Sequence, residues 1–152
     1  SMVRFPKGAV PADIPALERL DGLDILHKGA TQQVLIISVG SMAGMAIEVA
    51  QLAKAQSIEI TVVDPLWVKP LPKSVLQMCA EYATVIVMED GIRHAGIAST
   101  ISEALRESGT VCSLHSIGVP LEFIEHSKRA EILEDIAITP EAIVQQISGW
   151  IS

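Results

Sequence analysis

Residues that could do chemistry gather where runs of apolar residues end. Four such runs lie between residues 34 and 117, and the groups that follow them are Gly40-Ser41, Asp64, Glu89-Asp90 and Gly118. Glycine turns before a helix can hold a phosphate, and paired carboxylates can act as acid and base or bind a metal. Open α/β sheets bind ligands beyond the carboxyl ends of their strands, so a site is expected among these residues.

The segment Gly40–Gly44 is a candidate phosphate loop, because its glycine turn leads into a predicted helix. It matches neither the G-x-G-x-x-G pattern nor a P-loop, which needs Lys-Ser/Thr after its last glycine. The alternative is a tight turn that lets the helix pack closely on the strand. The missing motif favours the tight turn.

Glu89 and Asp90 are adjacent, and neighbouring residues in a turn seldom direct both carboxylates at one atom. Asp90-Gly91 is also a common turn dipeptide. We therefore favour a structural role, in which Asp90 caps the following helix or faces a partner subunit. His94 lies near Glu89 in the sequence, which favours a salt link or hydrogen bond over catalysis. Glu89, Asp90 and His94 are accordingly predicted as interface residues.

The sequence lacks the usual signatures of a metal site or a nucleophile. Its four histidines include no i, i+4 pair, and no C-x-x-C motif accompanies them. Ser41, His94 and Asp64 can be drawn as a catalytic triad, but a nucleophile elbow needs G-x-S-x-G. We expect no catalytic residue, cofactor-binding residue or metal ligand in this chain.

The elements that must position these residues follow from hydrophobic periodicity. Strands are predicted at 34–39, 58–63, 84–88 and 111–117, and the last of these alternates as a strand near an edge does. Helices are predicted from Ser41 as N-cap, from Pro72 as first residue, over Ala95–Glu107 with Gly109 as C-cap, near Ser127–Leu133, and from Thr139 as N-cap. This alternation predicts a three-layer α/β/α domain with a mostly parallel sheet of four or five strands.

Residues 1–33 have no stable period and are punctuated by prolines and glycines. We interpret them as a connecting arm from a preceding domain, with room for a short helical turn over Asp13–Leu20. Residues 34–152 are interpreted as the α/β domain. The chain is therefore expected to be a piece of a longer protein.

Composition narrows the classes of function. The 152 residues carry a net charge of −7, which argues against a nucleic-acid partner and against an anionic membrane surface. The longest apolar runs have about six residues, whereas a membrane helix needs roughly 20. Cys79 and Cys112 fall in apolar periodic segments, so we expect reduced core thiols and a cytoplasmic protein.

Four motifs, taken together, resemble one family of enzymes. They are Val3–Gly8, Val63–Leu71, Met88–Gly91 leading to Gly96, and Ser116–Pro120. Their order and intervals are similar to those in the C-terminal part of the 1-deoxy-D-xylulose-5-phosphate synthases, which are transketolase-like enzymes. The resemblance covers nearly the whole chain and implies the fold of a transketolase C-terminal domain.

The resemblance implies a parent enzyme that condenses pyruvate with glyceraldehyde 3-phosphate, with loss of carbon dioxide, using thiamine diphosphate and magnesium. Its product would feed isoprenoid, thiamine and pyridoxal synthesis. The family places the cofactor between two other domains, upstream of this one. The implied partners are those domains and the second subunit of a homodimer. We expect the fragment alone to be inactive, non-catalytic and free of thiamine diphosphate.

The resemblance also implies one substrate contact. Family members link the first arginine of an Arg-Tyr-Pro-Arg-Gly segment to the phosphate of the acceptor aldehyde, and Arg4 matches that position. Phe5 and Lys7 replace the tyrosine and the second arginine. Further departures are Leu66, where arginine is common, and His94-Ala95-Gly96, where a Gly-Gly-x-Gly stretch is usual.

Two other hypotheses remain open at this point. One is the equivalent domain of transketolase or of a 2-oxo acid dehydrogenase β subunit, against which the segments Arg4–Gly8 and Trp67–Leu71 favour the synthase. The other is a stand-alone nucleotide- or flavin-binding module, with Gly40–Gly44 as its phosphate loop. That module would bind its ligand at the carboxyl edge of the sheet.

Overall fold

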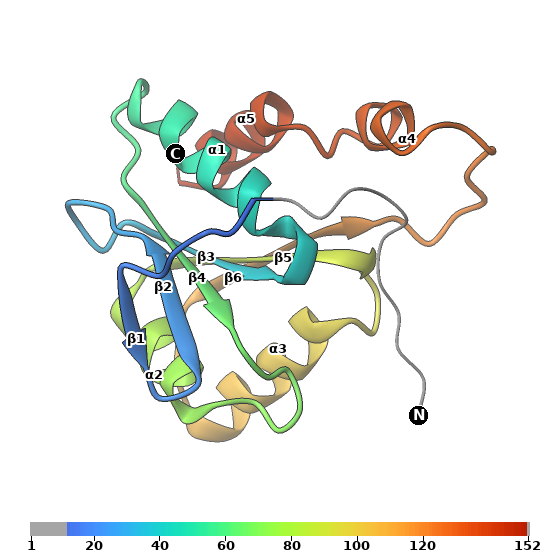
Figure 1. Ribbon diagram of the computed structural model, residues 1–152. Coiled ribbons are helices and arrows are strands. Elements are labelled where there is room, and N and C mark those ends of the chain that lie inside the picture. The colour runs from blue at the N-terminus through green and yellow to red at the C-terminus, as the bar shows by residue number, and fades with distance from the viewer. Residues whose placement is uncertain (1–11, 152) are drawn as a thin grey trace.

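Continuous apolar runs form the centre of a six-stranded sheet, which the computed structural model describes over residues 12–151 (Figure 1). The strands are β1 (Glu18–Leu20), β2 (Leu23–His27), β3 (Val34–Val39), β4 (Ile60–Pro65), β5 (Thr84–Ile92) and β6 (Ser113–Val119). They lie in the order β1-β2-β4-β3-β5-β6. The four strands from β4 to β6 are parallel to one another, and β6 is at the edge, as the alternation of its sequence predicted.

The two added strands, β1 and β2, were not predicted from the sequence. They form an antiparallel hairpin in which Leu20 pairs with Leu23, and β2 pairs antiparallel with β4. Gly22 closes the hairpin with a φ of 72°, a left-handed conformation that glycine adopts at little cost. The helical turn expected before residue 21 is therefore wrong for Glu18–Leu20, and the sheet has six strands instead of four or five. That residues 1–33 connect to a preceding domain stays a prediction.

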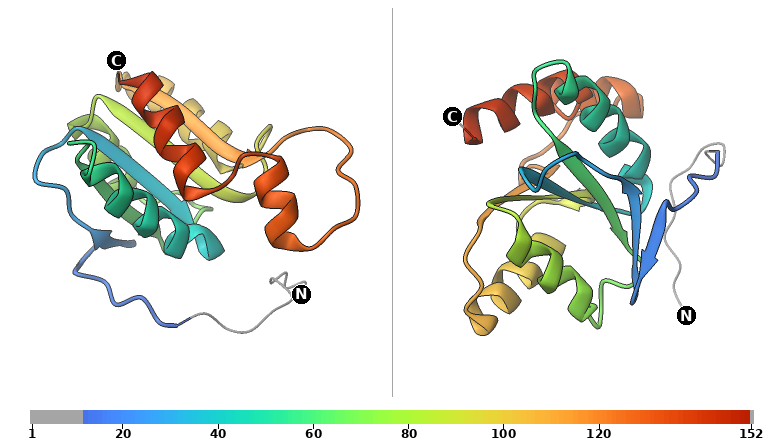
Figure 2. Two further views of the ribbon diagram at one scale, coloured as in Figure 1. Left: turned by 90° about the horizontal axis from the view of Figure 1, so that it is seen from above. Right: turned by 90° about the vertical axis from the view of Figure 1, so that its left-hand side faces the viewer.

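The helices cover both faces of the sheet, which confirms the predicted three-layer α/β architecture (Figure 2). They are the 3₁₀ turn η1 (Gly40–Met42) and the helices α1 (Ala43–Lys54), α2 (Lys73–Glu81), α3 (Ile97–Ser108), α4 (Arg129–Asp135) and α5 (Pro140–Trp150). α1 and α5 lie on one face, and α2 and α3 lie on the other (Figure 2, right).

Successive residues of the central strands supply both cores, because side chains alternate between the two faces of a strand. Val34 and Ile36 of β3 pack with α1 and α5, whereas Leu35 and Ile37 pack with α2 and α3. All four side chains are fully buried. Cys79 lies in the second core, and burial raises the pKa of its thiol to about 12, so it behaves as a small apolar side chain.

Several helix ends were predicted correctly. Thr139 accepts a hydrogen bond from the Ala142 amide at the start of α5, with Pro140 in the first position. Gly109 ends α3 in the left-handed conformation, with a φ of 71°. Two expectations were wrong. Ser41 does not cap α1, because the 3₁₀ turn intervenes, and Pro72 precedes the first residue of α2 instead of being that residue.

Among the described residues, no helix is both long enough and apolar enough to span a membrane.

Candidate functional site

The carboxyl ends of β3 and β5 meet at the point where the sheet reverses its winding. The chain leaves β3 for α1 on one face, and it leaves β5 for α3 on the opposite face. Such a switch point opens a crevice, which is the usual ligand site of a doubly wound sheet. Gly40-Ser41 and Glu89-Asp90 come together here, as the sequence analysis expected. We call this place the switch-point crevice.

Polar side chains of the chain itself bond to one another at the crevice. Ser41 Oγ donates a hydrogen bond of 3.1 Å to Asp90 Oδ2, and Arg129 Nη1 of α4 donates one of 3.0 Å to Asp90 Oδ1. The Asp90 carboxylate thus lies beside the hydroxyl that a phosphate loop would offer to its ligand. A phosphate would meet this negative charge, so the geometry disfavours Gly40–Gly44 as a nucleotide or flavin cradle.

Glu89 caps the start of α3, the role that the sequence analysis gave to Asp90. Its carboxylate accepts hydrogen bonds from the amides of Ile97 and Ala98, at 3.2 and 3.4 Å. A carboxylate is well placed at a helix N-terminus because that end carries a partial positive charge.

Two glycines make room for Glu89, which explains part of the motif around it. A Cβ on Gly96 would overlap the Glu89 carboxylate. A Cβ on Gly118 would lie 3.0 Å from the Gly91 carbonyl oxygen and 3.3 Å from Glu89 Cγ. The strand predicted to end at residue 117 continues through Gly118 to Val119 beside β5. Glu89 thus lies in a notch lined by Gly96 and Gly118, and its role is structural, as the cap of α3.

Asp64, at the end of β4, carries the clearest electrostatic perturbation. The pKa of its carboxyl is raised from 3.8 to about 6. Burial is the largest cause, the charge of Asp24 acts in the same direction, and a hydrogen bond from the Gly40 amide opposes both. Asp24 is directly opposite Asp64 in the β2–β4 pair. Asp64 therefore supports the turn after β3.

Arg19 neutralises Asp24, and sequence reasoning missed both residues. Arg19 Nε and Nη2 donate to the two oxygens of Asp24, at 2.6 and 2.8 Å. The hydrogen bonds from Arg19 lower the pKa of Asp24. The pKa values of the neighbouring Asp24 and Asp64 are therefore shifted in opposite directions. The pair lies on the β1–β2 hairpin, and the Asp21-Gly22 turn between its strands was the available signal.

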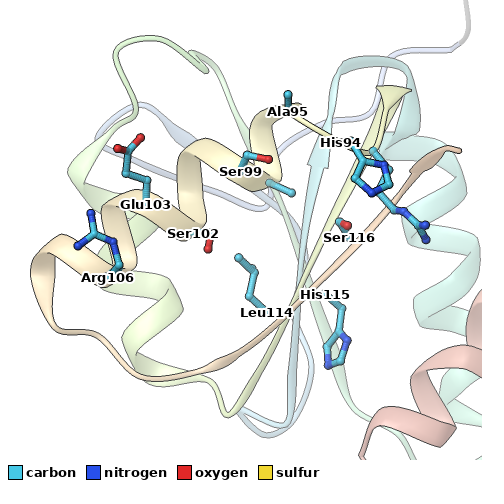
Figure 3. A pocket seen from close by; sticks show the side chains of 11 residues that line it. His94, Ala95, Ser99, Ser102, Glu103, Arg106, Leu114, His115 and Ser116 are labelled. Carbon is cyan, nitrogen blue, oxygen red and sulfur yellow. The ribbon is translucent and has the colours of Figure 1, made fainter. Parts of the chain in front are cut away.

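His94 lies apart from the crevice. The expected salt link or hydrogen bond between His94 and Glu89 does not form. It lines a cavity of about 580 Å³ between α3 and β6, which we call the α3–β6 groove (Figure 3). Ser41, His94 and Asp64 are not linked by any hydrogen bond in the part of the chain that the structure describes, because Ser41 bonds to Asp90 and Asp64 to Gly40. The triad drawn from the sequence is not assembled.

His115, any metal ligands and Arg4 remain to be placed. His115 of β6 stacks on Trp150, with ring centres 4.1 Å apart, and its pKa is lowered by burial. Residues 12–151 contain no group of three or more His, Cys, Asp or Glu side chains placed to hold a metal ion. Arg4 lies outside the described residues.

The family model described as "Transketolase, C-terminal domain" matches residues 23–143, so the chain belongs to that family. The solved structures agree with this fold. The chain superposes on a split-gene transketolase, described as an inactive β4 tetramer, with a TM-score of 0.78 at 22% identity, covering 91% of this chain and 46% of that one. It superposes on the transketolase of Campylobacter jejuni with a TM-score of 0.64 at 18% identity, covering 89% and 20%.

Curated relatives give a finer likeness. The chain is 47% identical to the 1-deoxy-D-xylulose-5-phosphate synthase of Leifsonia xyli over 97% of its own length, and 42% identical to that of Rhodococcus erythropolis over 100%. It spans only 23% and 24% of these two relatives. The resemblance inferred from the motifs is thus confirmed for the C-terminal domain of a synthase, and the transketolase alternative is not favoured.

Proposed function

We propose that this chain is the non-catalytic C-terminal domain of a thiamine diphosphate- and magnesium-dependent 1-deoxy-D-xylulose-5-phosphate synthase of the cytoplasm. The parent enzyme condenses pyruvate with glyceraldehyde 3-phosphate, with loss of carbon dioxide, in isoprenoid, thiamine and pyridoxal precursor synthesis. The domain packs against the upstream domains and supports the homodimer. Its identity to synthases, more than 40% for both relatives, supports this assignment.

One observation carries the non-catalytic role. At the switch-point crevice, where this fold would hold a ligand, Asp90 is bonded to Ser41 and Arg129, and Glu89 is bonded to the first amides of α3.

The carboxyl edge is the part of this domain best suited to packing against the rest of the enzyme. Six of the ten large apolar side chains that the described residues expose follow β4, end β5 or follow β6 at this edge: Leu66, Trp67, Val68, Ile92, Leu121 and Phe123. Exposed apolar patches of this kind mark interaction surfaces. Glu89 and Asp90 hold this edge in shape through their hydrogen bonds to α3, Ser41 and Arg129. His94 lies beside the edge, in the α3–β6 groove.

The role of Arg4 is proposed from the family motif alone. Its guanidinium would bind the phosphate of glyceraldehyde 3-phosphate in the parent enzyme, because a guanidinium matches phosphate oxygens with two hydrogen bonds. Arg4→Ala in the full-length enzyme should raise the KM for that substrate. An unchanged KM would remove Arg4 from the site.

The decisive experiment uses the full-length synthase with Asp90→Asn, and a second form that lacks residues 12–152, which include all six strands of the sheet. Asp90→Asn should keep kcat and both KM values within about threefold, since the crevice takes no part in the reaction. Removal of the domain should convert the dimer to monomers in light scattering. A kcat loss of a hundredfold or more in a folded, dimeric Asp90→Asn enzyme would overturn the proposal, as would a truncated enzyme that stays dimeric and fully active.

A further inference from the structure

Hydrogen-bond donors without a partner among the described residues line the α3–β6 groove. Ser99 and Ser102 of α3 and Ser116 of β6 line it, and their hydroxyls form no hydrogen bond with another described residue. In Figure 3 these three side chains lie along one cavity, between His94 at one end and Arg106 at the other. The groove therefore presents donors from two separate elements to the same space.

The charges of the groove are also unpaired. The described ion pairs use Arg19, Lys28, Lys128 and Arg129, and none of them involves Arg93 or Arg106. Both arginines line the groove, whereas Glu103 is its one acidic lining residue and lies beside Arg106 (Figure 3). The lining near Arg93 and His94 contains no acidic residue, and the Glu89 carboxylate beside it is hydrogen-bonded to the Ile97 and Ala98 amides.

A strained turn holds that basic end in place. Ala95 has a φ of 60°, a left-handed conformation that costs a non-glycine residue of order 1 kcal/mol or more. The Arg93 amide donates a hydrogen bond of 2.8 Å to the Val119 carbonyl, which ties the turn to the end of β6. The turn places His94 over the groove. The N-terminal amides of α3 are not offered as donors to a ligand, because two of them already donate to Glu89.

We propose that the α3–β6 groove binds a small organic phosphate, with its phosphate group between Arg93, His94, Ser99 and Ser116. A phosphate offers three terminal oxygens, and this end of the groove supplies guanidinium, imidazole and hydroxyl donors around one space. Ala98 and Leu114 provide an apolar wall for the carbon skeleton, and Ser102, Glu103 and Arg106 contact its polar far end. The volume of about 580 Å³ suits a small metabolite.

The test is a titration of the 152-residue chain, followed by amide chemical shifts in two-dimensional NMR. The probes are inorganic phosphate, glycerol 3-phosphate and acetate at constant ionic strength. Saturable shifts should map to residues 93–99, 102 and 113–116, with glycerol 3-phosphate tightest and acetate weakest. Equal binding of acetate and phosphate would overturn the phosphate assignment, and shifts that do not saturate at tens of millimolar would overturn the site.

Matched variants separate a built site from general attraction of anions. Arg93→Gln should weaken glycerol 3-phosphate binding about tenfold, because it removes one bidentate partner. Lys54→Gln, which makes the same charge change at the exposed end of α1 on the other face of the sheet, should leave binding unchanged. An equal loss in both variants would contradict the proposal. The result does not depend on the parent enzyme's activity, so it can fail while the proposed function stands.

Discussion

The switch-point crevice and the α3–β6 groove are lined by similar polar side chains. At the crevice these side chains bond to one another, whereas in the groove they do not. In the crevice, a serine hydroxyl and an arginine are consumed by Asp90. In the groove, three serine hydroxyls and two arginines form no such bond with the described residues, and Glu103 is the one carboxylate in the lining. The sheet topology places a crevice at the switch point, but the Asp90 carboxylate there uses the donors that a ligand would need.

The notch around Glu89 should give the largest effect. Gly96→Ala forces a Cβ into the Glu89 carboxylate and costs α3 its cap, so the free energy of unfolding should fall by about 2 to 3 kcal/mol in urea. Gly44→Ala is the matched control, because it adds a Cβ in open space within α1 and should be neutral or stabilise by up to about 1 kcal/mol. Equal effects of the two substitutions would show that Glu89 is not held in the notch.

Asp64 should give the next effect, visible as a dependence on pH. Its pKa rises from an ordinary 3.8 to about 6 on folding, so between these values the native state binds more protons than the unfolded state. Stability from this group is complete below about pH 3.8 and is lost as the pH rises through 6. Asp64→Asn should therefore match the parent chain near pH 4 and exceed it by roughly 1 to 2 kcal/mol at pH 7, after allowance for partial exposure. A difference that does not change with pH would contradict this assignment.

The closing contact of the crevice should be worth less. The Asp90 side chain is 23% exposed and that of Arg129 is 51% exposed, so their ion pair is screened by water. In a double-mutant cycle of Asp90→Ala and Arg129→Ala, the coupling energy should lie below about 1 kcal/mol. A coupling of several kcal/mol would mean that the crevice, rather than the Glu89 notch, fixes this end of the sheet.

Substitutions in the α3–β6 groove should have the smallest effect on folding. Because the side-chain donors of Arg93 and Ser102 bond to no other described residue, Arg93→Gln and Ser102→Ala should change the unfolding free energy by no more than about 0.5 kcal/mol. Thermal and urea unfolding provide the measurement. A large loss from either substitution would place these side chains in the fold, and the contrast between groove and crevice would disappear.

The sequence predicted the parts of this molecule that depend on local pattern. The apolar run Val34–Val39 is typical of a strand buried on both faces, and Thr139-Pro140 is a strong helix start. The hairpin of β1 and β2 was missed although Asp21-Gly22 is a two-residue hairpin turn, because the strands beside it are short and the prolines upstream suggested an arm.

The position of the candidate site could be predicted from the sequence, but the hydrogen bonds between its side chains could not. The carboxyl ends of the strands did bring Gly40-Ser41 and Glu89-Asp90 together. The contact from Arg129 could not be inferred, since it comes from α4, far along the chain, and depends on tertiary packing. For the same reason, no local pattern indicated that His94 lines a groove instead of contacting Glu89.

The central claim is that the chemistry of the parent enzyme lies outside this domain, and one titration tests it most directly. The 152-residue chain is titrated calorimetrically with thiamine diphosphate in the presence of magnesium, with the full-length synthase measured in parallel. The account predicts micromolar binding to the full-length enzyme and no binding heat from the fragment at millimolar cofactor. Micromolar binding to the fragment would contradict it.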